Sequence, residues 1–302
     1  MFILPRRRFI WLRKLSLVLL GLFFFYFWMS RQEWMKFRTT PRELVALTQQ
    51  GTSLPVYWGW AKDSQKRFIF YLLAGAHDKP VLCLVHGSPG ASSAWSAYLS
   101  DASLYQHFRL LVFDRPGFGF SQFGEEEKSL SGQVEALRAV LEVIKTPEVI
   151  LAGHSLGGPV IAKFVMQYPD LVSGLVFLAA SVDPHLEPIY WWQKPLEHPL
   201  LSWLLPPAFR VSNNEIIPLR GELEKLQMTW PNISQPILIM HGQRDRLVPY
   251  ENVHFLENQL LYKPELITLR DEDHFFIWTN PQAVITALID FYHRRIAPKH
   301  LK

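Results

Sequence analysis

Cysteine is nearly absent from this sequence, which contains one such residue, Cys83, among 302. A single thiol excludes an intrachain disulfide and argues against a metal site built from thiolates. Cys83 lies in the apolar run from Val81 to Val85, where a buried strand residue is expected. Because disulfide-free proteins occur on either side of a membrane, this scarcity does not identify the redox compartment.

Motifs for nucleotide and metal binding are also absent. Gln122 stands where a dinucleotide-binding loop beginning at Gly117 would have its third glycine, and no Walker A lysine occurs. The 11 histidines form neither an H-E-x-x-H pair nor a Cys/His cluster. The sequence therefore predicts no metal ion and no cofactor.

Acidic residues are scarce at the N-terminus. Residues 1–42 contain nine Lys and Arg against one acid, whereas the remainder contains 22 Lys and Arg against 26 acids. The net charge of +4 therefore has a local origin. This asymmetry predicts an N-terminal address or membrane contact, and it argues against a nucleic-acid surface on the folded part.

A long apolar segment follows the first arginines. Residues 15–29 carry no charge, and the apolar stretch extends to residues 9–29 if Arg13 and Lys14 reach the membrane interface. No small-residue cleavage pattern follows it, so we expect an uncleaved signal anchor that crosses the membrane. The excess of positive charge before the segment favours an extracytoplasmic, or periplasmic, location for the domain that follows it. The alternative is a buried helix of the globular part.

These features divide the chain into an N-terminal basic region and anchor, residues 1–38, and a folded domain, residues 39–302. In the folded domain, short apolar runs alternate with helical stretches, which predicts an α/β fold with a mostly parallel sheet. The expected strands are 67–73, 81–85, 109–113, 148–152, 174–178, 236–240 and 265–269, and the expected helices are 131–145, 156–168, 250–261 and 281–295.

The alternation stops between about residues 182 and 232. This interval is rich in Pro, Trp, Leu and Tyr, and we interpret it as a helical cap inserted into the domain. Its aromatic residues, which include Tyr190, Phe209 and Trp230, either line an apolar acyl or alcohol pocket or pack on the core beneath. Trp191, Trp192 and Trp203 are the substrate-binding candidates among them.

The strongest motif is Gly153-His154-Ser155-Leu156-Gly157, which lies between an expected strand and an expected helix. Glycines are required where a sharp strand-to-helix turn holds a serine in a strained conformation above the sheet. A serine hydroxyl is a weak nucleophile and needs a histidine base oriented by an acid. Ser155 is therefore the candidate nucleophile.

Two downstream loops supply the partners. Asp245 follows one expected strand and His274 follows another, so both would lie at the carboxyl ends of strands, where active-site groups gather. Asp183, after the strand 174–178, is the reserve candidate for the acid. His86, His154 and His241 are expected to brace loops by hydrogen bonds.

The order Ser155, Asp245, His274 resembles that of the α/β-hydrolase superfamily. His86-Gly87-Ser88-Pro89-Gly90 looks like the oxyanion loop of that family, and Asp114 to Ser121 looks like its D-x-x-G-x-G-x-S turn. The resemblance covers about residues 53–296. It implies an eight-stranded sheet flanked by helices, with the backbone N–H groups of Ser88 and Leu156 as the oxyanion hole.

The sequence thus predicts hydrolysis of an ester or a related carbonyl compound, an apolar acyl substrate above all, through an acyl-enzyme on Ser155. Amide, thioester or carbon–carbon bond hydrolysis are alternatives within the same fold. A noncatalytic binding protein that retains the fold is the alternative from another class.

Overall fold

The computed structural model describes residues 6–299, so the first five residues of the predicted basic region lie outside it. Eight strands form one sheet in the order β1-β2-β4-β3-β5-β6-β7-β8. Pairing is antiparallel among β1, β2 and β4 and parallel across the rest. The strands are β1 Val56–Lys62, β2 Phe68–Ala74, β3 Val81–Val85, β4 Arg109–Phe113, β5 Val149–His154, β6 Val172–Leu178, β7 Ile237–Gly242 and β8 Glu265–Leu269. The predicted eight-stranded, mostly parallel sheet is confirmed.

The central strands are buried on both faces. In β3 all five residues are buried, and alternate side chains enter two separate hydrophobic cores: Leu82 and Leu84 face one, Cys83 and Val85 the other. Such strands read as continuous apolar runs, which is why they were recognisable in the sequence. One core lies under α5, α6 and α11, and the opposite core lies under α2, α3 and α13.

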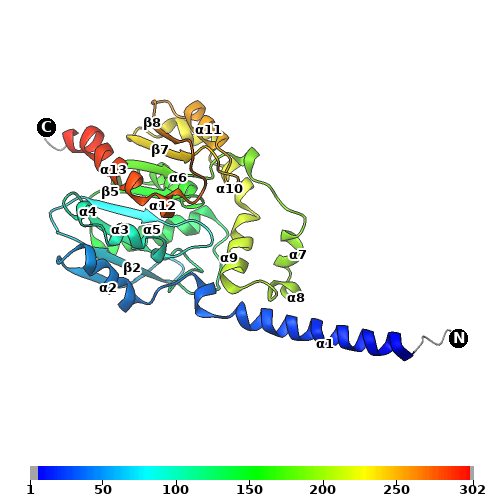
Figure 1. The fold of residues 1–302 in the computed structure, drawn as a ribbon. Helices are drawn as coiled ribbons and strands as arrows, with labels where there is room; N and C mark the ends of the chain where they lie inside the picture. The colour runs from blue at the N-terminus through cyan, green and yellow to red at the C-terminus, as the bar shows by residue number, and fades with distance from the viewer. Residues whose placement is uncertain (1–5, 300–302) are drawn as a thin grey trace.

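Helices cover both faces of the sheet (Figure 1). They are α2 Pro41–Gly51, α3 Ser96–Leu99, α4 Ala102–Tyr105, α5 Leu130–Ile144, α6 Gly157–Gln167, α11 Glu251–Gln259, α12 Phe276–Thr279 and α13 Pro281–Phe291. Capping sets several of their ends. The Ser129 side chain accepts a hydrogen bond from the Gly132 N–H at the start of α5, which ends at Lys145 in the left-handed conformation.

The segment between β6 and β7 forms a cap of short helices beside the carboxyl ends of the parallel strands (Figure 1). It contains η4 Pro184–Leu186, α7 Gln193–Glu197, α8 Pro199–Ser202, α9 Pro207–Ile216, α10 Leu219–Glu224 and η5 Gln227–Asn232. The cap corresponds to the insertion expected at about residues 182–232.

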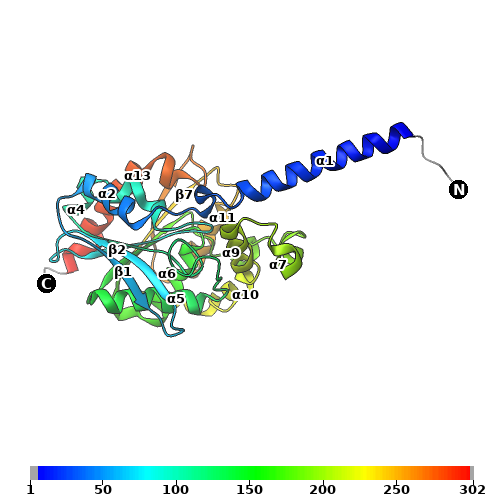
Figure 2. The ribbon, with the colours of Figure 1, turned by 90° about the horizontal axis from the view of Figure 1, so that it is seen from below.

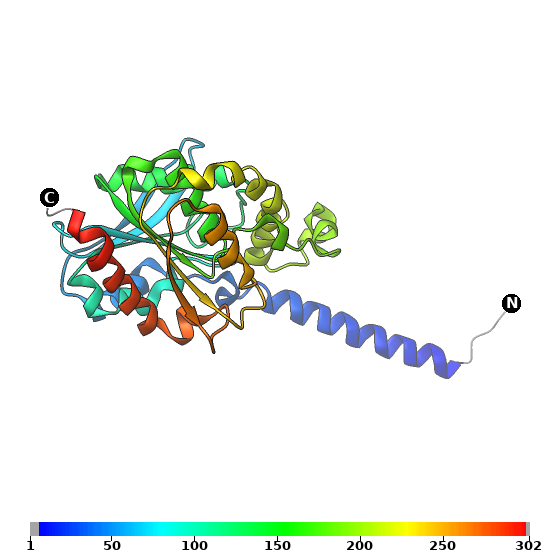
Figure 3. The same cartoon turned by 90° about the horizontal axis from the view of Figure 1, so that it is seen from above.

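Helix α1, Arg6–Met29, projects from the body of the molecule (Figures 2 and 3). Its C-terminal part touches the cap, where the Trp203 ring lies 5.7 Å from that of Phe23 and 6.0 Å from that of Phe27. The Arg31 guanidinium donates to the Trp203 carbonyl oxygen at 2.8 Å. The short helix η1, Glu33–Lys36, then connects α1 to the domain.

Among residues 6–299, no helix is both long enough and apolar enough to cross a membrane. The transmembrane helix predicted for residues 9–29 is therefore not supported. Arg13 and Lys14 interrupt the apolar sequence, and the uncharged run of residues 15–29 spans only about 22 Å at about 1.5 Å per residue. The hydrocarbon core of a bilayer is about 30 Å thick.

Candidate active site

Ser155 lies on the sharp turn between β5 and α6. Its φ of 53° is in the left-handed region, which is uncommon for a residue with a side chain. The turn is held by neighbouring backbone: the Ser155 N–H donates to Leu178 O at 3.0 Å, and the Gly158 N–H donates to Ser155 O at 2.9 Å. A strained residue fixed by its surroundings is typical of a functional site.

The two glycines beside this turn are required by close packing. A Cβ at Gly153 would lie 2.4 Å from the carbonyl oxygen of Gly157. A Cβ at Gly157 would lie 2.5 Å from the carbonyl oxygen of Val85. The G-x-S-x-G spacing therefore reflects contacts between β3, β5 and the start of α6.

Asp245 and His274 meet although 29 residues separate them. Both lie in loops at the carboxyl ends of strands, Asp245 after β7 and His274 after β8. The His274 Nδ1–H donates to Asp245 Oδ2 at 2.7 Å, and both side chains are buried. Asp245 Oδ1 accepts from the backbone N–H groups of Leu247 and Val248 at 2.9 and 2.8 Å.

The electrostatics of this pair favour an ionised carboxylate. Burial by itself raises the pKa of Asp245, but hydrogen bonds with His241 and His274 outweigh it and hold that pKa well below its usual range. His241 Nε2 lies 3.4 Å from Asp245 Oδ2. The ionised Asp245 carboxylate can therefore hold the His274 imidazole in one orientation.

His154 holds the His274 loop in place through a hydrogen bond to its backbone. Its Nε2–H donates to the His274 carbonyl oxygen at 3.1 Å, and the two rings are 4.7 Å apart. Burial, together with repulsion from a protonated His274, lowers the pKa of His154 to about 3. It therefore stays neutral at physiological pH and acts as the brace predicted from the sequence.

The loop that carries Ser88 is held by Arg115, which is fully buried. The Arg115 backbone N–H donates to His86 Nε2 at 2.9 Å, and its guanidinium donates to the carbonyl oxygens of His86 and Gly87 at 3.0 and 2.9 Å. Its charge is paired with Glu215 of α9, at 2.8 and 3.0 Å. One buried ion pair therefore joins the cap to this loop.

The backbone N–H groups of Ser88 and Leu156 point to no acceptor among the described residues. Both residues line one cavity together with Ser155. The Ser88 hydroxyl instead donates to Ser212 Oγ of α9 at 2.8 Å. Two unengaged N–H groups beside a serine are the arrangement that binds a developing oxyanion.

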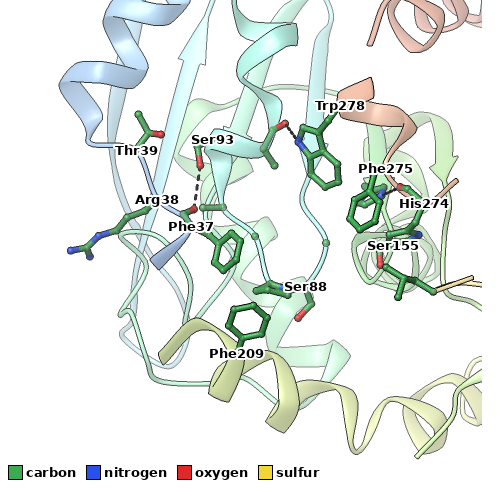
Figure 4. Close-up of a pocket in the computed structure, with 17 residues that line it drawn as sticks. Phe37, Arg38, Thr39, Ser88, Ser93, Ser155, Phe209, His274, Phe275 and Trp278 are labelled. Atoms are coloured by element: carbon green, nitrogen blue, oxygen red, sulfur yellow. Dashed lines mark hydrogen bonds between the residues drawn. The ribbon is translucent and has the colours of Figure 1, made fainter. Parts of the chain in front are cut away.

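Two cavities meet at Ser155. The larger, of about 760 Å³, is apolar over most of its wall. Figure 4 shows Phe37 and Phe209 on one side of it and Ser155 and His274 on the other. The connector after η1 contributes Phe37, whose ring lies 5.4 Å from that of Phe209 and whose carbonyl accepts from the Ser93 hydroxyl.

The smaller cavity, of about 230 Å³, extends beneath the cap and shares Ser88, Ser155, Leu247 and His274 with the larger one. Trp192 lines it. Trp191 is 87% exposed, and Trp203 packs against α1, so neither lines a cavity at Ser155.

Other candidates lie apart from this centre. Asp183, the reserve acid, caps η4 by accepting from the His185 N–H at 2.9 Å. Within residues 6–299, no group of three or more His, Cys, Asp or Glu side chains could hold a metal ion. Phe209, one of the cap aromatics expected to line a pocket or pack on the core, lines the larger cavity. Phe37 in the larger cavity and Glu187 and Gln193 in the smaller were not predicted from the sequence.

Comparison with known proteins agrees with this architecture. Residues 80–208 match the family model described as alpha/beta hydrolase fold. A bifunctional esterase/perhydrolase of Acinetobacter calcoaceticus is 31% identical over 116 residues, 38% of this chain and 42% of that protein. A pimeloyl-[acyl-carrier protein] methyl ester esterase of Hamiltonella defensa is 34% identical over 113 residues, 36% of this chain and 41% of that protein.

The chain thus spans less than half the length of these curated relatives. Among solved structures, a membrane phospholipase A described as a bacterial virulence factor superposes with a TM-score of 0.64 at 18% identity. That alignment covers 96% of this chain and 98% of the other. At this identity, the likeness shows the fold.

Proposed function

We propose that this chain is a serine hydrolase of the α/β-hydrolase type that cleaves a small-molecule ester. Its sheet topology and the family match over residues 80–208 support this proposal. The observation that carries the proposal is the 2.7 Å hydrogen bond from His274 to Asp245 beside a cavity that Ser155 also lines. Relatives that are esterases support an ester as the substrate.

In the proposed reaction each group has one step. Since His274 Nδ1–H is engaged by Asp245, Nε2 is left to accept the Ser155 proton as Oγ attacks the carbonyl carbon. The N–H groups of Ser88 and Leu156 stabilise the oxyanion. The alcohol leaves with the proton from His274, and water activated by the same histidine releases the acid from the acyl-enzyme.

A fluorophosphonate probe tests the nucleophile. We expect labelling of the wild type, labelling of the control Ser234→Ala, whose serine is exposed on the surface, and none of Ser155→Ala. Hydrolysis of p-nitrophenyl esters should fall by about 10⁶ in Ser155→Ala. Equal labelling of wild type and Ser155→Ala would exclude Ser155 as the nucleophile, and no labelling of either would favour a noncatalytic binding protein.

The class of bond is tested separately. Matched p-nitrophenyl esters, p-nitroanilides and thioesters of one acyl group would rank the ester first if the proposal holds. A faster anilide or thioester, or activity confined to a carbon–carbon bond substrate, would replace the esterase assignment while keeping the nucleophile.

We also propose that α1 holds the enzyme at a membrane through residues 9–29, with the hydrolase domain on the extracytoplasmic, periplasmic side. The support is the exposure of apolar side chains around the helix, including Leu17 at 62%, Phe24 at 60% and Trp28 at 58%. A contiguous exposed apolar surface of this kind indicates an interaction site.

Membrane fractionation decides this second proposal. A chain that begins at Gln32 keeps η1 and Phe37 but lacks α1, and it should leave the membrane fraction that retains the full chain. Equal membrane binding by both chains would exclude α1 as the anchor. Protease added to intact cells with a permeabilised outer membrane should degrade the domain if it is periplasmic.

A further inference from the structure

The smaller cavity at Ser155 has hydrogen-bonding side chains of the cap segment in its wall. Glu187, Gln193 and Ser181 all line it, and all three lie in or beside the cap. It opens onto the same Ser155 and His274 that the larger apolar cavity reaches. An ester bound at Ser155 therefore has the larger cavity on one side and, on the other, a smaller cavity whose wall includes the side chains of Glu187 and Gln193.

Glu187 is held in place from two directions. The Ser181 hydroxyl donates to Glu187 Oε1, and the Arg220 guanidinium donates to the Glu187 carbonyl oxygen at 2.8 Å. Among the described residues, Oε2 accepts no hydrogen bond, although it belongs to a side chain of the cavity wall. Burial raises the pKa of Glu187. One acceptor therefore remains for a ligand.

Gln193 offers the complementary group. Its Oε1 accepts from the Tyr190 backbone N–H at 2.7 Å, which fixes the orientation of the amide. No acceptor for Nε2 is found among the described residues, although the residue is only 3% exposed. The cavity thus presents a fixed donor from Gln193 and a fixed acceptor from Glu187.

We propose that the smaller cavity binds the leaving alcohol of the substrate and selects an alcohol with further hydroxyl groups, as in a glycerol monoester, through Glu187 and Gln193. A hydroxyl donates and accepts, so it satisfies both residues at once. An ammonium group would leave the Gln193 donor unused. It would also meet the guanidinium of Arg220, which already lies beside Glu187.

The size of the cavity and the chemistry of the proposed reaction agree with this assignment, which rests on the proposed esterase function. At about 30 Å³ per water molecule, the cavity has room for roughly seven water-sized groups, enough for a three-carbon polyol. In acylation, the Ser155 Oγ–carbonyl bond forms and the carbonyl–glycerol oxygen bond breaks. The Ser155 proton passes through His274 to the departing glycerol oxygen, and the apolar acyl group stays in the larger cavity.

The experiment compares kcat/KM for 1-monooctanoylglycerol, methyl octanoate and octanoylcholine, which share one acyl chain. We expect the wild type to prefer the glycerol ester over the methyl ester by at least about tenfold. The ratio of the two kcat/KM values cancels any difference in the amount of active enzyme. It should approach one in Glu187→Leu and in Gln193→Leu.

Two further variants sharpen the result. Glu187→Gln keeps an acceptor oxygen, so an intermediate ratio is expected. Glu224→Leu removes an exposed carboxylate of the same cap and should leave the ratio at the wild-type value.

A wild-type ratio near one, a ratio that Glu187→Leu leaves unchanged, or a preference for octanoylcholine would overturn the assignment. The kcat/KM ratio of the wild type needs no variant, so it tests the assignment of the smaller cavity even if Glu187→Leu does not fold. Failure of the esterase proposal gives a different result, in which none of the three esters is hydrolysed and the fluorophosphonate probe does not label Ser155.

Discussion

The ion pair between Arg115 and Glu215 joins the cap to the loop that carries Ser88, and Glu215→Gln removes its negative charge without changing its shape. The Arg115 and Glu215 side chains are 0% and 2% exposed, so water cannot replace the lost carboxylate. The guanidinium would remain buried with its hydrogen bonds to the carbonyls of His86 and Gly87 but without a counter-charge.

Removing one partner of a buried pair costs about 3–5 kcal/mol, because the remaining charge is uncompensated. The glutamine keeps one acceptor oxygen for Arg115, so we expect the lower end, about 3 kcal/mol. For a domain of this size, about 2 °C in the unfolding midpoint corresponds to each kcal/mol, which gives a decrease of about 6 °C.

Thermal unfolding followed by circular dichroism measures this decrease. Glu142→Gln is the matched control, because it neutralises one partner of the Arg138–Glu142 pair, whose side chains are 41% and 63% exposed. Exposed pairs of this kind contribute about 0.5 kcal/mol or less, so the control should lose no more than about 1 °C. A midpoint for Glu215→Gln within 1 °C of that control would refute the argument that Glu215 compensates a buried charge.

Further outcomes follow from the geometry. Asp245→Asn should lower kcat for a p-nitrophenyl ester by about 10⁴ in steady-state assays, because the amide stabilises the wrong tautomer of His274. Since the folded pKa of Asp245 is lowered, its stabilisation is present above the ordinary value of 3.8 and is lost as the pH falls through the lowered value. Acid unfolding curves of wild type and Asp245→Asn should therefore converge at low pH. Gly157→Ala places a Cβ 2.5 Å from a backbone carbonyl oxygen and should lower the unfolding midpoint, whereas Gly221→Ala in α10, with nothing within 4 Å, should raise it. Cys83 is fully buried, and burial raises the pKa of its thiol, so a thiol reagent should react with it only after unfolding.

Most of the strands that the sequence predicted are buried on both faces, and β8, an edge strand, was predicted from its short apolar run. β3 is buried on both faces, and its bounds agree with the prediction. β1 was missed because it has no continuous apolar run: Trp58 and Trp60 are 44% and 45% exposed, and Gly59 interrupts the run between them. Its conformation depends on antiparallel pairing with β2, which no local pattern reveals.

A similar contrast between local sequence pattern and tertiary packing explains which residues of the site could be predicted. Ser155, Asp245 and His274 belong to motifs with local requirements, namely close-packed glycines or positions directly after strands, so they could be named from the sequence. Glu187 is a single acid in an irregular loop, and Phe37 belongs to the segment, residues 1–38, that was assigned to the basic region and anchor. Their places in the cavity walls are set by tertiary packing of the cap and of the segment after α1.

The contact between α1 and Trp203 also has a consequence in time. About 175 residues separate the two partners, and at about 5–20 residues per second the ribosome needs roughly 9 to 35 s to synthesise that interval. Throughout this delay Phe23 and Phe27 have no indole to pack against. In every round of synthesis, α1 is therefore exposed to its surroundings before it can pack on Trp203 of its own domain.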